Sequence, residues 1–357
     1  MMKIDHIDKN FKVNAQITEK DIVFYDAFES PISYYGVAEK TSEGIFRLPK
    51  AIAHTVSEGV ELLCGNTAGV RVRFQTNSDY IAIFAEYESV SSFSHMPQTG
   101  VAGFDMYVYS NGGYEYAKTF IPPDDFKDSY CSEHYFDSSE MRDITINFPL
   151  YSSVRALSIG LRESSTLQSG QKYRNDKPIV YYGSSITQGG CASRPGLSYE
   201  AIISRKFNCD YVNLGFSGTA RAETEIAEYI SRLDMCCFVY DYDHNAPDEG
   251  YLSETHKPMF DIIRKAHPDL PIIMASLPWH DKNNCGWVIK KRKVILDTYH
   301  KAIAAGDKNV YFIDGMKFYE KYGMSDCTVD GCHPNDLGFK AMAGAFIAVI
   351  EKSRVFE

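Results

Sequence analysis

Residues 177–190, KPIVYYGSSITQGG, decide how the chain folds. A short apolar run, Ile179 to Tyr182, ends in a turn of glycines and serines, and the polar segment 162–176 precedes it. An apolar run of this length that ends at such a turn is typical of a buried strand in a parallel sheet. We therefore expect a new domain to begin near residue 177.

After this point strands and helices alternate. The predicted strands are 179–182, 211–214, 236–240, 271–276 and 310–313, and the predicted helices are 198–207, 222–233, 254–266, 287–304 and 336–352. Alternation of this kind is typical of a parallel sheet with helices on both faces. The sequence therefore predicts an α/β fold, a three-layer αβα domain over residues 177–357.

The first half of the chain has a different rhythm. Its β-rich runs are 70–74, 80–87, 103–109, 114–120, 143–148 and 154–161. The stretch Ser110-Asn111-Gly112-Gly113 between two of these runs is a strong hairpin signal. Short alternating strands without a long helical pattern predict an antiparallel, jelly-roll-like β-sandwich. We place this domain at residues 1–165.

The composition excludes several classes of protein. The 357 residues are 44% hydrophobic, and Asp plus Glu outnumber Lys plus Arg by 47 to 37, for a net charge of -10. A chain this acidic repels a phosphate backbone overall and its sequence shows no basic stripe, so we expect no nucleic-acid partner. No apolar run approaches the roughly 18 residues of a membrane span. The polar N-terminus lacks a secretion signal and the nine cysteines form no CxxC pair, so we expect a cytoplasmic protein with reduced thiols. A homo-oligomer stays possible.

The residues with reactive side chains follow the predicted strands. Ligands of open parallel sheets gather at the carboxyl ends of the strands. The segments that reach this rim are Gly183–Gly190, Asn213–Gly218, Asp241–Asn245, Pro278–Asp281 and, before the last helix, Asp330–Pro334. They supply a serine, an imidazole with a carboxylate three residues before it, and several hydrogen-bond donors. This is the set of groups that nucleophilic acyl transfer requires.

Each group has a chemical role. A serine hydroxyl becomes a nucleophile when an imidazole takes its proton, and a carboxylate on the other ring nitrogen holds the imidazole in the right tautomer. We predict that Ser185 is the nucleophile, His333 the base and Asp330 its orienting carboxylate. Preorganised donors then stabilise the oxyanion. We assign these donors to the Ser185 N–H, the Gly218 N–H and the Asn245 side-chain amide.

Structural explanations compete with these roles. Ser185 could cap a helix, Gly218 could permit a turn and Asn245 could form an Asx turn. The acidic residues and histidine of 241–244 have no matching distal ligand set, so we expect neither a metal nor another cofactor. Trp279 is either a core residue or a flat surface for a sugar or acyl group.

The pattern resembles the SGNH (GDSL) superfamily of serine esterases, most specifically in DGCHPNDLGF at 330–339. The resemblance covers about 179–352 and implies the same roles for Ser185, Gly218, Asn245, Asp330 and His333. Ser184 stands where these enzymes carry aspartate, which leaves both serines as candidate nucleophiles. The third block, Asp243-His244-Asn245-Ala246, also departs from the usual Gly-x-Asn-Asp.

The N-terminal half has a resemblance of its own. Gly103-Phe104-Asp105-Met106-Tyr107 is similar to the Gly-x-Asp-Leu-Tyr signature of a β-sandwich that precedes the hydrolase domain in a subgroup of these enzymes. That subgroup is similar to two-domain carbohydrate acetyl esterases. We also expect the sandwich to lend a loop to the active site.

These observations predict a serine esterase. Its expected substrates are short acyl esters, above all acetyl esters, of sugars or oligosaccharides, with Trp279 against the sugar. An acyltransferase or a lysophospholipase-like lipid esterase would use the same groups. A non-catalytic carbohydrate-binding protein is the alternative outside enzymes.

Overall fold

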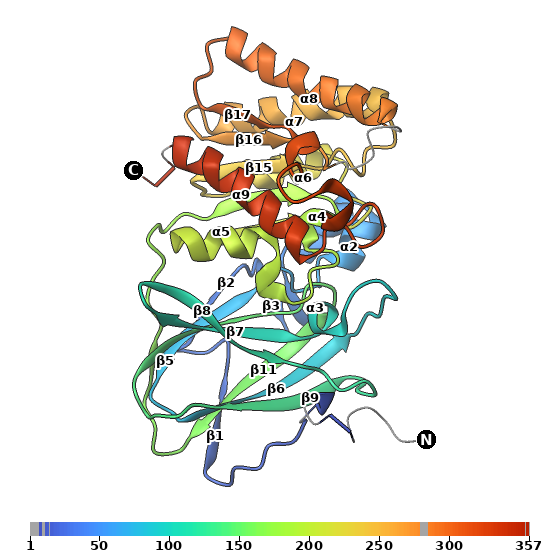
Figure 1. The fold of residues 1–357 in the computed structure, drawn as a ribbon. Helices are drawn as coiled ribbons and strands as arrows, with labels where there is room; N and C mark the ends of the chain where they lie inside the picture. The colour runs from blue at the N-terminus through green and yellow to red at the C-terminus, as the bar shows by residue number, and fades with distance from the viewer. Residues whose placement is uncertain (1–6, 9–10, 14, 279–284, 354, 357) are drawn as a thin grey trace.

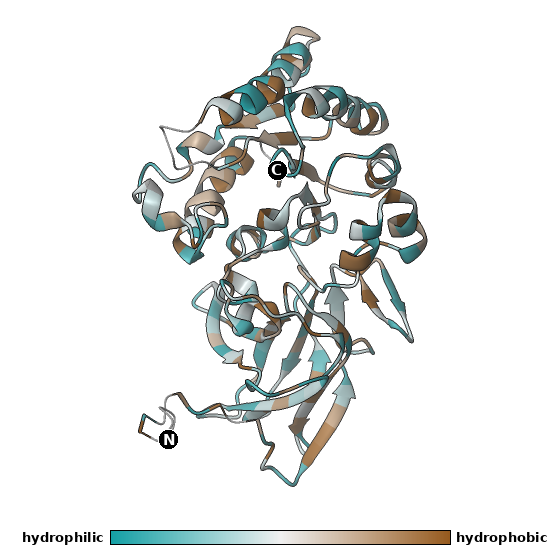
Figure 2. Ribbon diagram, turned by 90° about the vertical axis from the view of Figure 1, so that its right-hand side faces the viewer, coloured by the Kyte–Doolittle hydropathy of each residue, from teal (hydrophilic) through white to brown (hydrophobic). Residues whose placement is uncertain are grey.

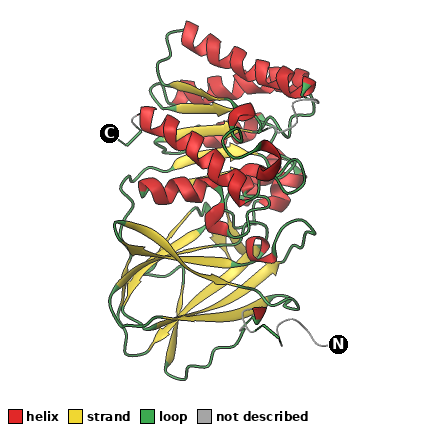
Figure 3. Ribbon diagram, in the orientation of Figure 1, coloured by secondary structure: helices red, strands yellow, loops and turns green. Residues whose placement is uncertain are grey.

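The computed structural model describes residues 7–8, 11–13, 15–278, 285–353 and 355–356. The N-terminal half consists mostly of strands. In the C-terminal half, helices surround a separate parallel sheet (Figures 1 and 3). The expected α/β fold with a preceding antiparallel sandwich is confirmed. No helix within the described ranges is both long and apolar enough to cross a membrane.

The sandwich consists of two antiparallel sheets. One has the strand order β1-β11-β6-β9 and the other β12-β5-β10-β7-β8, with β2 also paired to β5. The strands are β1 Ile22–Asp26, β2 Ser33–Tyr35, β5 Arg71–Thr76, β6 Tyr80–Ser89, β7 Phe104–Ser110, β8 Gly113–Phe120, β9 Ser129–Tyr135, β10 Arg142–Asn147, β11 Ser153–Arg162 and β12 Leu167–Ser169. The predicted hairpin joins β7 to β8, and Asn111 and Gly112 both have the positive φ that a tight hairpin turn requires.

The first half also contains elements that the pattern did not predict. They are strands β1, β2, β9 and β12, the ribbon of β3 Glu39–Thr41 and β4 Gly44–Phe46, and the short helices α1 Lys50–Val56, α2 Glu58–Leu63 and α3 Gln98–Val101. Three-residue strands and helices of one or two turns are too short to show a hydrophobic period. Helix α1 packs against α6 (Thr224–Ile230) of the C-terminal half, so this insertion contributes to the contact between the two halves.

The C-terminal half is built on a parallel sheet of order β14-β13-β15-β16-β17. Its elements are β13 Ile179–Gly183, α4 Ser185–Gln188, α5 Tyr199–Phe207, β14 Tyr211–Gly215, α6 Thr224–Ile230, β15 Cys237–Asp241, α7 Glu249–Ala266, β16 Ile272–Ala275, α8 Gly286–Ala304, β17 Val310–Ile313 and α9 Asp336–Ser353, with short 3-10 turns at Pro195–Leu197, Gly315–Lys317 and Met324–Cys327. The strand order reverses direction beside β13, which is where ligands bind in such sheets.

The side chains of alternate residues in strand β13 point to opposite faces of the sheet. Tyr181 packs in the cluster that includes α5 and α9, whereas Tyr182 packs in the cluster that includes α6, α7 and α8. Both side chains are at most 1% exposed. Figure 2 shows hydrophobic colour along the central strands and mixed colours on the surrounding helices, as expected for amphipathic helices on a buried sheet.

Arg47 links the two halves beneath the strand ends. Its guanidinium is fully buried and donates hydrogen bonds to the backbone oxygens of Asn213 (2.8 Å) and Gly215 (3.0 Å) in β14 and of Leu63 (3.0 Å) in α2. Burial lowers the pKa of Arg47 to about 10, so the group stays charged at neutral pH. The backbone at the end of β14 is thereby held by a side chain of the N-terminal half.

Asp105, from the Gly-x-Asp motif, forms a second link. The side chain is completely buried in β7, and its Oδ2 accepts hydrogen bonds from Arg194 Nη1 (2.7 Å) and from the Gly196 N–H (2.8 Å). Its Oδ1 accepts from Asn147 Nδ2 (2.8 Å). Arg194 and Gly196 lie in the segment between α4 and α5, so the motif residue anchors the chain that follows Ser185.

We predict that Asp105→Ala lowers the free energy of unfolding by about 3–5 kcal/mol, because it removes the carboxylate that pairs with the largely covered Arg194 guanidinium and accepts the buried Gly196 N–H. Urea denaturation of both proteins measures the difference. Glu86→Ala is the control, because the Glu86–Arg155 pair (3.0 Å) is solvent-exposed and its loss should cost less than about 1 kcal/mol. Equal effects of the two substitutions would contradict the anchoring role.

Candidate active site

The two candidate nucleophiles occupy different positions at the start of α4. Ser184 is the N-cap: its side chain is 1% exposed and its Oγ accepts the Ile186 N–H (3.2 Å). Ser185 is the first helical residue and is partly exposed. The two serines therefore have separate tasks, one closing the helix end and the other facing the rim of the sheet.

Ser185, His333 and Asp330 form a continuous hydrogen-bonded chain. Ser185 Oγ lies 2.9 Å from His333 Nε2, and His333 Nδ1 lies 2.8 Å from Asp330 Oδ2. An ionised carboxylate can only accept, so Nδ1 carries the ring proton and Nε2 has its lone pair directed at the hydroxyl. This is the arrangement in which an imidazole can remove the serine proton.

The loop before α9 fixes Asp330. Burial raises the pKa of this carboxyl, but the hydrogen bond from the His333 ring and the N–H groups of His333 (2.7 Å) and Cys332 (3.0 Å) outweigh it and lower the pKa to about 2. Asp330 is therefore ionised at any pH at which His333 acts as a base. Its contribution to stability is present above the ordinary aspartate pKa and is lost as the pH falls towards 2.

Two backbone N–H groups are available as oxyanion donors. Among the hydrogen bonds of the described ranges, neither the Ser185 N–H nor the Gly218 N–H has an acceptor. Gly218 has a φ of +73° and faces open space. Gly215, at the end of β14, must be glycine because a Cβ would lie 2.2 Å from the Gln188 N. This close approach brings the loop after β14 against α4.

Asn245 is tied to the same loop. Its Nδ2 donates one hydrogen bond to the Phe216 backbone oxygen (3.0 Å), and an amide carries a second proton. Gln188 supports the loop from the other side, because its Oε1 accepts the Ser217 N–H (3.0 Å). The sequence analysis identified Asn245 but not Gln188. The hydrogen-bond partners of Gln188 lie far away in the sequence, so no local motif indicates its role.

We predict that Asn245→Ala lowers kcat for p-nitrophenyl acetate by about 10²–10³-fold, as loss of one side-chain oxyanion donor does. KM should change little, because the interaction strengthens only when charge develops on the oxygen. Steady-state kinetics separate the two constants. A change in KM alone would show that Asn245 only shapes the loop.

The sandwich contributes to the same region. The rings of His95 and His333 lie 5.7 Å apart between centroids, and His95 Nε2 is 3.8 Å from Asp330 Oδ2. Tyr151 donates its hydroxyl proton to the Ser185 backbone oxygen (3.2 Å). Phe93 packs edge-on against both the Tyr151 and the His95 ring. His95 and Tyr151 lie far from the serine turn in the sequence, so no motif could reveal them.

Burial shifts the pKa values of the acidic residues and the histidine in 241–244. Asp241 accepts the hydroxyl protons of Thr187 (2.5 Å) and Tyr199 (3.3 Å), and burial raises its pKa to about 8. Asp243 accepts the Leu277 N–H (3.0 Å), and burial raises its pKa to about 7. Burial lowers the pKa of His244 to about 4, with a smaller contribution from His333. Trp279, the predicted sugar-binding residue, lies outside the described residues.

A serine–imidazole–carboxylate chain at the carboxyl ends of the strands of an αβα sheet is an arrangement typical of serine hydrolases. The chain belongs to the GDSL-like lipase/acylhydrolase family, whose model matches residues 176–351. The model for the N-terminus of SGNH-hydrolase-type esterases, GxDLY, matches residues 22–167. The expected family and its sandwich-bearing subgroup are confirmed.

Solved structures share the two-domain fold. A protein from Bacteroides ovatus described as a GDSL-like lipase is 28% identical, with a TM-score of 0.83 over 93% of this chain and 98% of its own. A salicylyl-acyltransferase from a tetracycline biosynthetic pathway is 19% identical (TM-score 0.76; 95% and 100%). A family two carbohydrate esterase from Clostridium thermocellum is 15% identical (0.58; 82% and 94%). None of the curated proteins matches the chain.

Proposed function

We propose that this hydrolase is a serine esterase that cleaves short acyl esters, above all acetyl esters, of sugars or oligosaccharides. The observation that carries the proposal is the Ser185–His333–Asp330 chain beside two backbone N–H groups that have no acceptor among the described residues. Carbohydrate esterases, including an acetyl xylan esterase from Butyrivibrio proteoclasticus, share the fold, which supports a sugar ester as substrate.

The reaction follows from the geometry. Ser185 Oγ attacks the ester carbonyl while His333 Nε2 takes its proton, and the oxyanion receives hydrogen bonds from the Ser185 and Gly218 N–H groups and from Asn245. His333 then protonates the leaving alkoxide, which leaves an acyl group on Ser185. Water, deprotonated by the same ring, hydrolyses this acyl-enzyme and restores the serine.

The side chains around Ser185 favour a small acyl group. Gly190 lies against the backbone of Ser185, to whose oxygen its N–H donates (2.8 Å), and a Cβ there would be 2.9 Å from the Tyr151 hydroxyl and 3.2 Å from His333 Cδ2. Tyr151 is held against the Ser185 backbone and is 6% exposed. The close approach of the Tyr151 and His333 side chains to the Ser185 turn supports a methyl-sized acyl group over a long chain.

A series of p-nitrophenyl esters tests the acyl group. We predict that kcat/KM falls steeply from acetyl to butyryl to octanoyl, because added methylenes meet the aromatic wall. Highest activity with octanoate would overturn the short-acyl proposal. For the alcohol part, acetylated xylo- or manno-oligosaccharides should be better substrates than aryl acetates, and equal rates would refute the preference for sugar esters.

Acyl transfer is the second candidate function, favoured by the similarity to the salicylyl-acyltransferase. The same acyl-enzyme would then pass its acyl group to an alcohol in place of water. Incubation with p-nitrophenyl acetate and candidate sugars, followed by mass spectrometry, distinguishes the two. Acylated sugar in excess over free acetate would identify a transferase, and free acetate alone would identify an esterase.

A further inference from the structure

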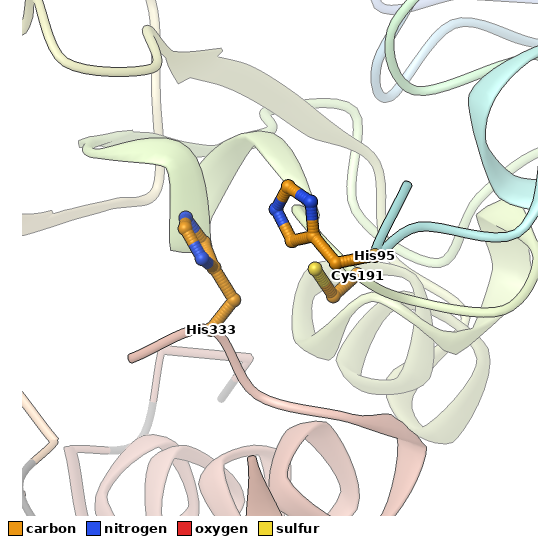
Figure 4. Close-up of side chains that lie close together, drawn as sticks. All are labelled: His95, Cys191 and His333. Carbon is orange, nitrogen blue, oxygen red and sulfur yellow. The ribbon is translucent and has the colours of Figure 1, made fainter. Parts of the chain in front are cut away.

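His95, Cys191 and His333 converge at the edge of the active site. Their potential ligand atoms all lie within 4.8 Å of one another. Figure 4 shows the two imidazole rings and the sulfur directed towards a common space from three separate segments of the chain. His95 belongs to the sandwich loop before α3, Cys191 follows α4, and His333 precedes α9.

The ligand types identify the metal that would fit. Two imidazoles and a thiolate are the ligands that Zn²⁺ takes in tetrahedral sites, with the fourth position left to water. Hard cations such as Mg²⁺ and Ca²⁺ require oxygen ligands instead. Zinc–ligand bonds of about 2.0–2.3 Å require the three atoms to approach one another slightly. The His95 side chain is 45% exposed on its loop and has room for this movement.

We propose that His95, Cys191 and His333 form an inhibitory site for Zn²⁺ or a related soft divalent cation. Both nitrogens of His333 already have partners, Ser185 at Nε2 and Asp330 at Nδ1. Metal binding at either nitrogen breaks one of these contacts and withdraws the base from catalysis. The Cys191 thiol releases its proton to solvent on binding. The sandwich domain would thus supply one ligand, His95, of the metal that inhibits the hydrolase site.

Other cysteines provide matched controls, because all nine are free thiols. Cys332 is adjacent to His333 in sequence but is not one of the three converging residues. His54 is an exposed histidine of α1, far from the three ligands in sequence and paired with Glu61 (2.9 Å). Cys332→Ser and His54→Ala therefore remove a thiol and an imidazole of the same kinds without altering the proposed site.

The first experiment measures binding and does not depend on activity. Co²⁺ replaces Zn²⁺ as a spectroscopic probe, added to metal-free protein in buffer without a thiol reductant. We expect a thiolate-to-cobalt charge-transfer band that is retained in Cys332→Ser and absent in Cys191→Ser. A missing band in the wild-type protein, or a band that persists in Cys191→Ser, overturns the site even if the protein is an active esterase.

The second experiment measures inhibition and rests on the proposed esterase function. Zn²⁺ should lower the initial rate with p-nitrophenyl acetate, whereas Mg²⁺ should not. His95→Ala and Cys191→Ser should raise the half-inhibiting Zn²⁺ concentration at least about tenfold. Removing a residue that only supports a metal ligand already lowers metal affinity by about this factor, so removing a ligand itself should have at least the same effect. Inhibition of each variant is expressed relative to its own zinc-free rate, so a change in basal activity does not enter the comparison. Equal sensitivity of these variants and the two controls refutes the proposal.

Discussion

Ser185→Ala is expected to reduce kcat for p-nitrophenyl acetate by on the order of 10⁶-fold, the loss that follows removal of a triad nucleophile. A methyl group cannot form the acyl-enzyme, so only the oxyanion donors and substrate binding remain to accelerate the reaction. Stopped-flow or steady-state kinetics at substrate saturation give the ratio. Circular dichroism checks that the fold is intact.

Ser184→Ala is the matched control for this substitution. It removes a hydroxyl one residue away that only caps α4, so it should cost about 1 kcal/mol of stability and leave kcat within a few-fold of the wild type. An inactive Ser184→Ala with an active Ser185→Ala would reverse the assignment of the nucleophile.

Asp330→Asn is expected to have the second large effect and to lower kcat by about 10⁴-fold. The same substitution has an effect of this size in a Ser–His–Asp triad. Asn can still accept the N–H groups of Cys332 and His333, which bind Oδ1, so the loop should stay folded. Its amide NH₂ at the position of Oδ2, however, donates to His333 Nδ1. The ring proton is then forced onto Nε2, and the imidazole can no longer accept the proton of Ser185.

The pH profile distinguishes this explanation from simple loss of stability. In the wrong tautomer the His333 ring cannot accept the Ser185 proton, and hydroxide has to remove it instead. The variant should therefore regain part of its activity as the pH rises. Its thermal unfolding temperature should stay close to that of the wild type. A flat low rate together with a large fall in unfolding temperature would show that Asp330 is mainly structural.

The architecture of the C-terminal half was predictable because its signals are local. The strands of the parallel sheet are short, mostly apolar runs, and β17 has the predicted bounds of 310–313. The stripe that includes Phe339, Met342 and Phe346 on α9 is buried in the structure as its spacing requires. The spacing of apolar residues along a helix shows which of its faces is buried, so this prediction needs no information about distant residues.

The features that escaped prediction depend on long-range contacts. Arginine is rarely buried, and Arg47 is buried because its guanidinium satisfies carbonyl groups more than 160 residues away in β14. His95 lies in an irregular loop and meets His333 only when the two halves pack together. In contrast, the Asp330–His333 contact spans three residues, so spacing alone was enough to suggest it.

The contacts between the halves also explain why the sandwich accompanies the hydrolase domain. Arg47 holds the end of β14, which leads to Gly218, and Asp105 holds the segment after α4 that contains Arg194. Tyr151 contacts the backbone of Ser185 itself. We propose that the N-terminal domain preorganises the nucleophile turn and the oxyanion loop, so that neither has to rearrange when charge develops in the transition state.

Covalent labelling tests directly whether Ser185 is the activated nucleophile. The protein is treated with a fluorophosphonate probe, digested, and the modified peptide is sequenced by tandem mass spectrometry. We predict a single adduct on Ser185, formed much more slowly in Asp330→Asn and absent in Ser185→Ala. An adduct on Ser184, or an active enzyme that the probe neither labels nor inhibits, would contradict the account.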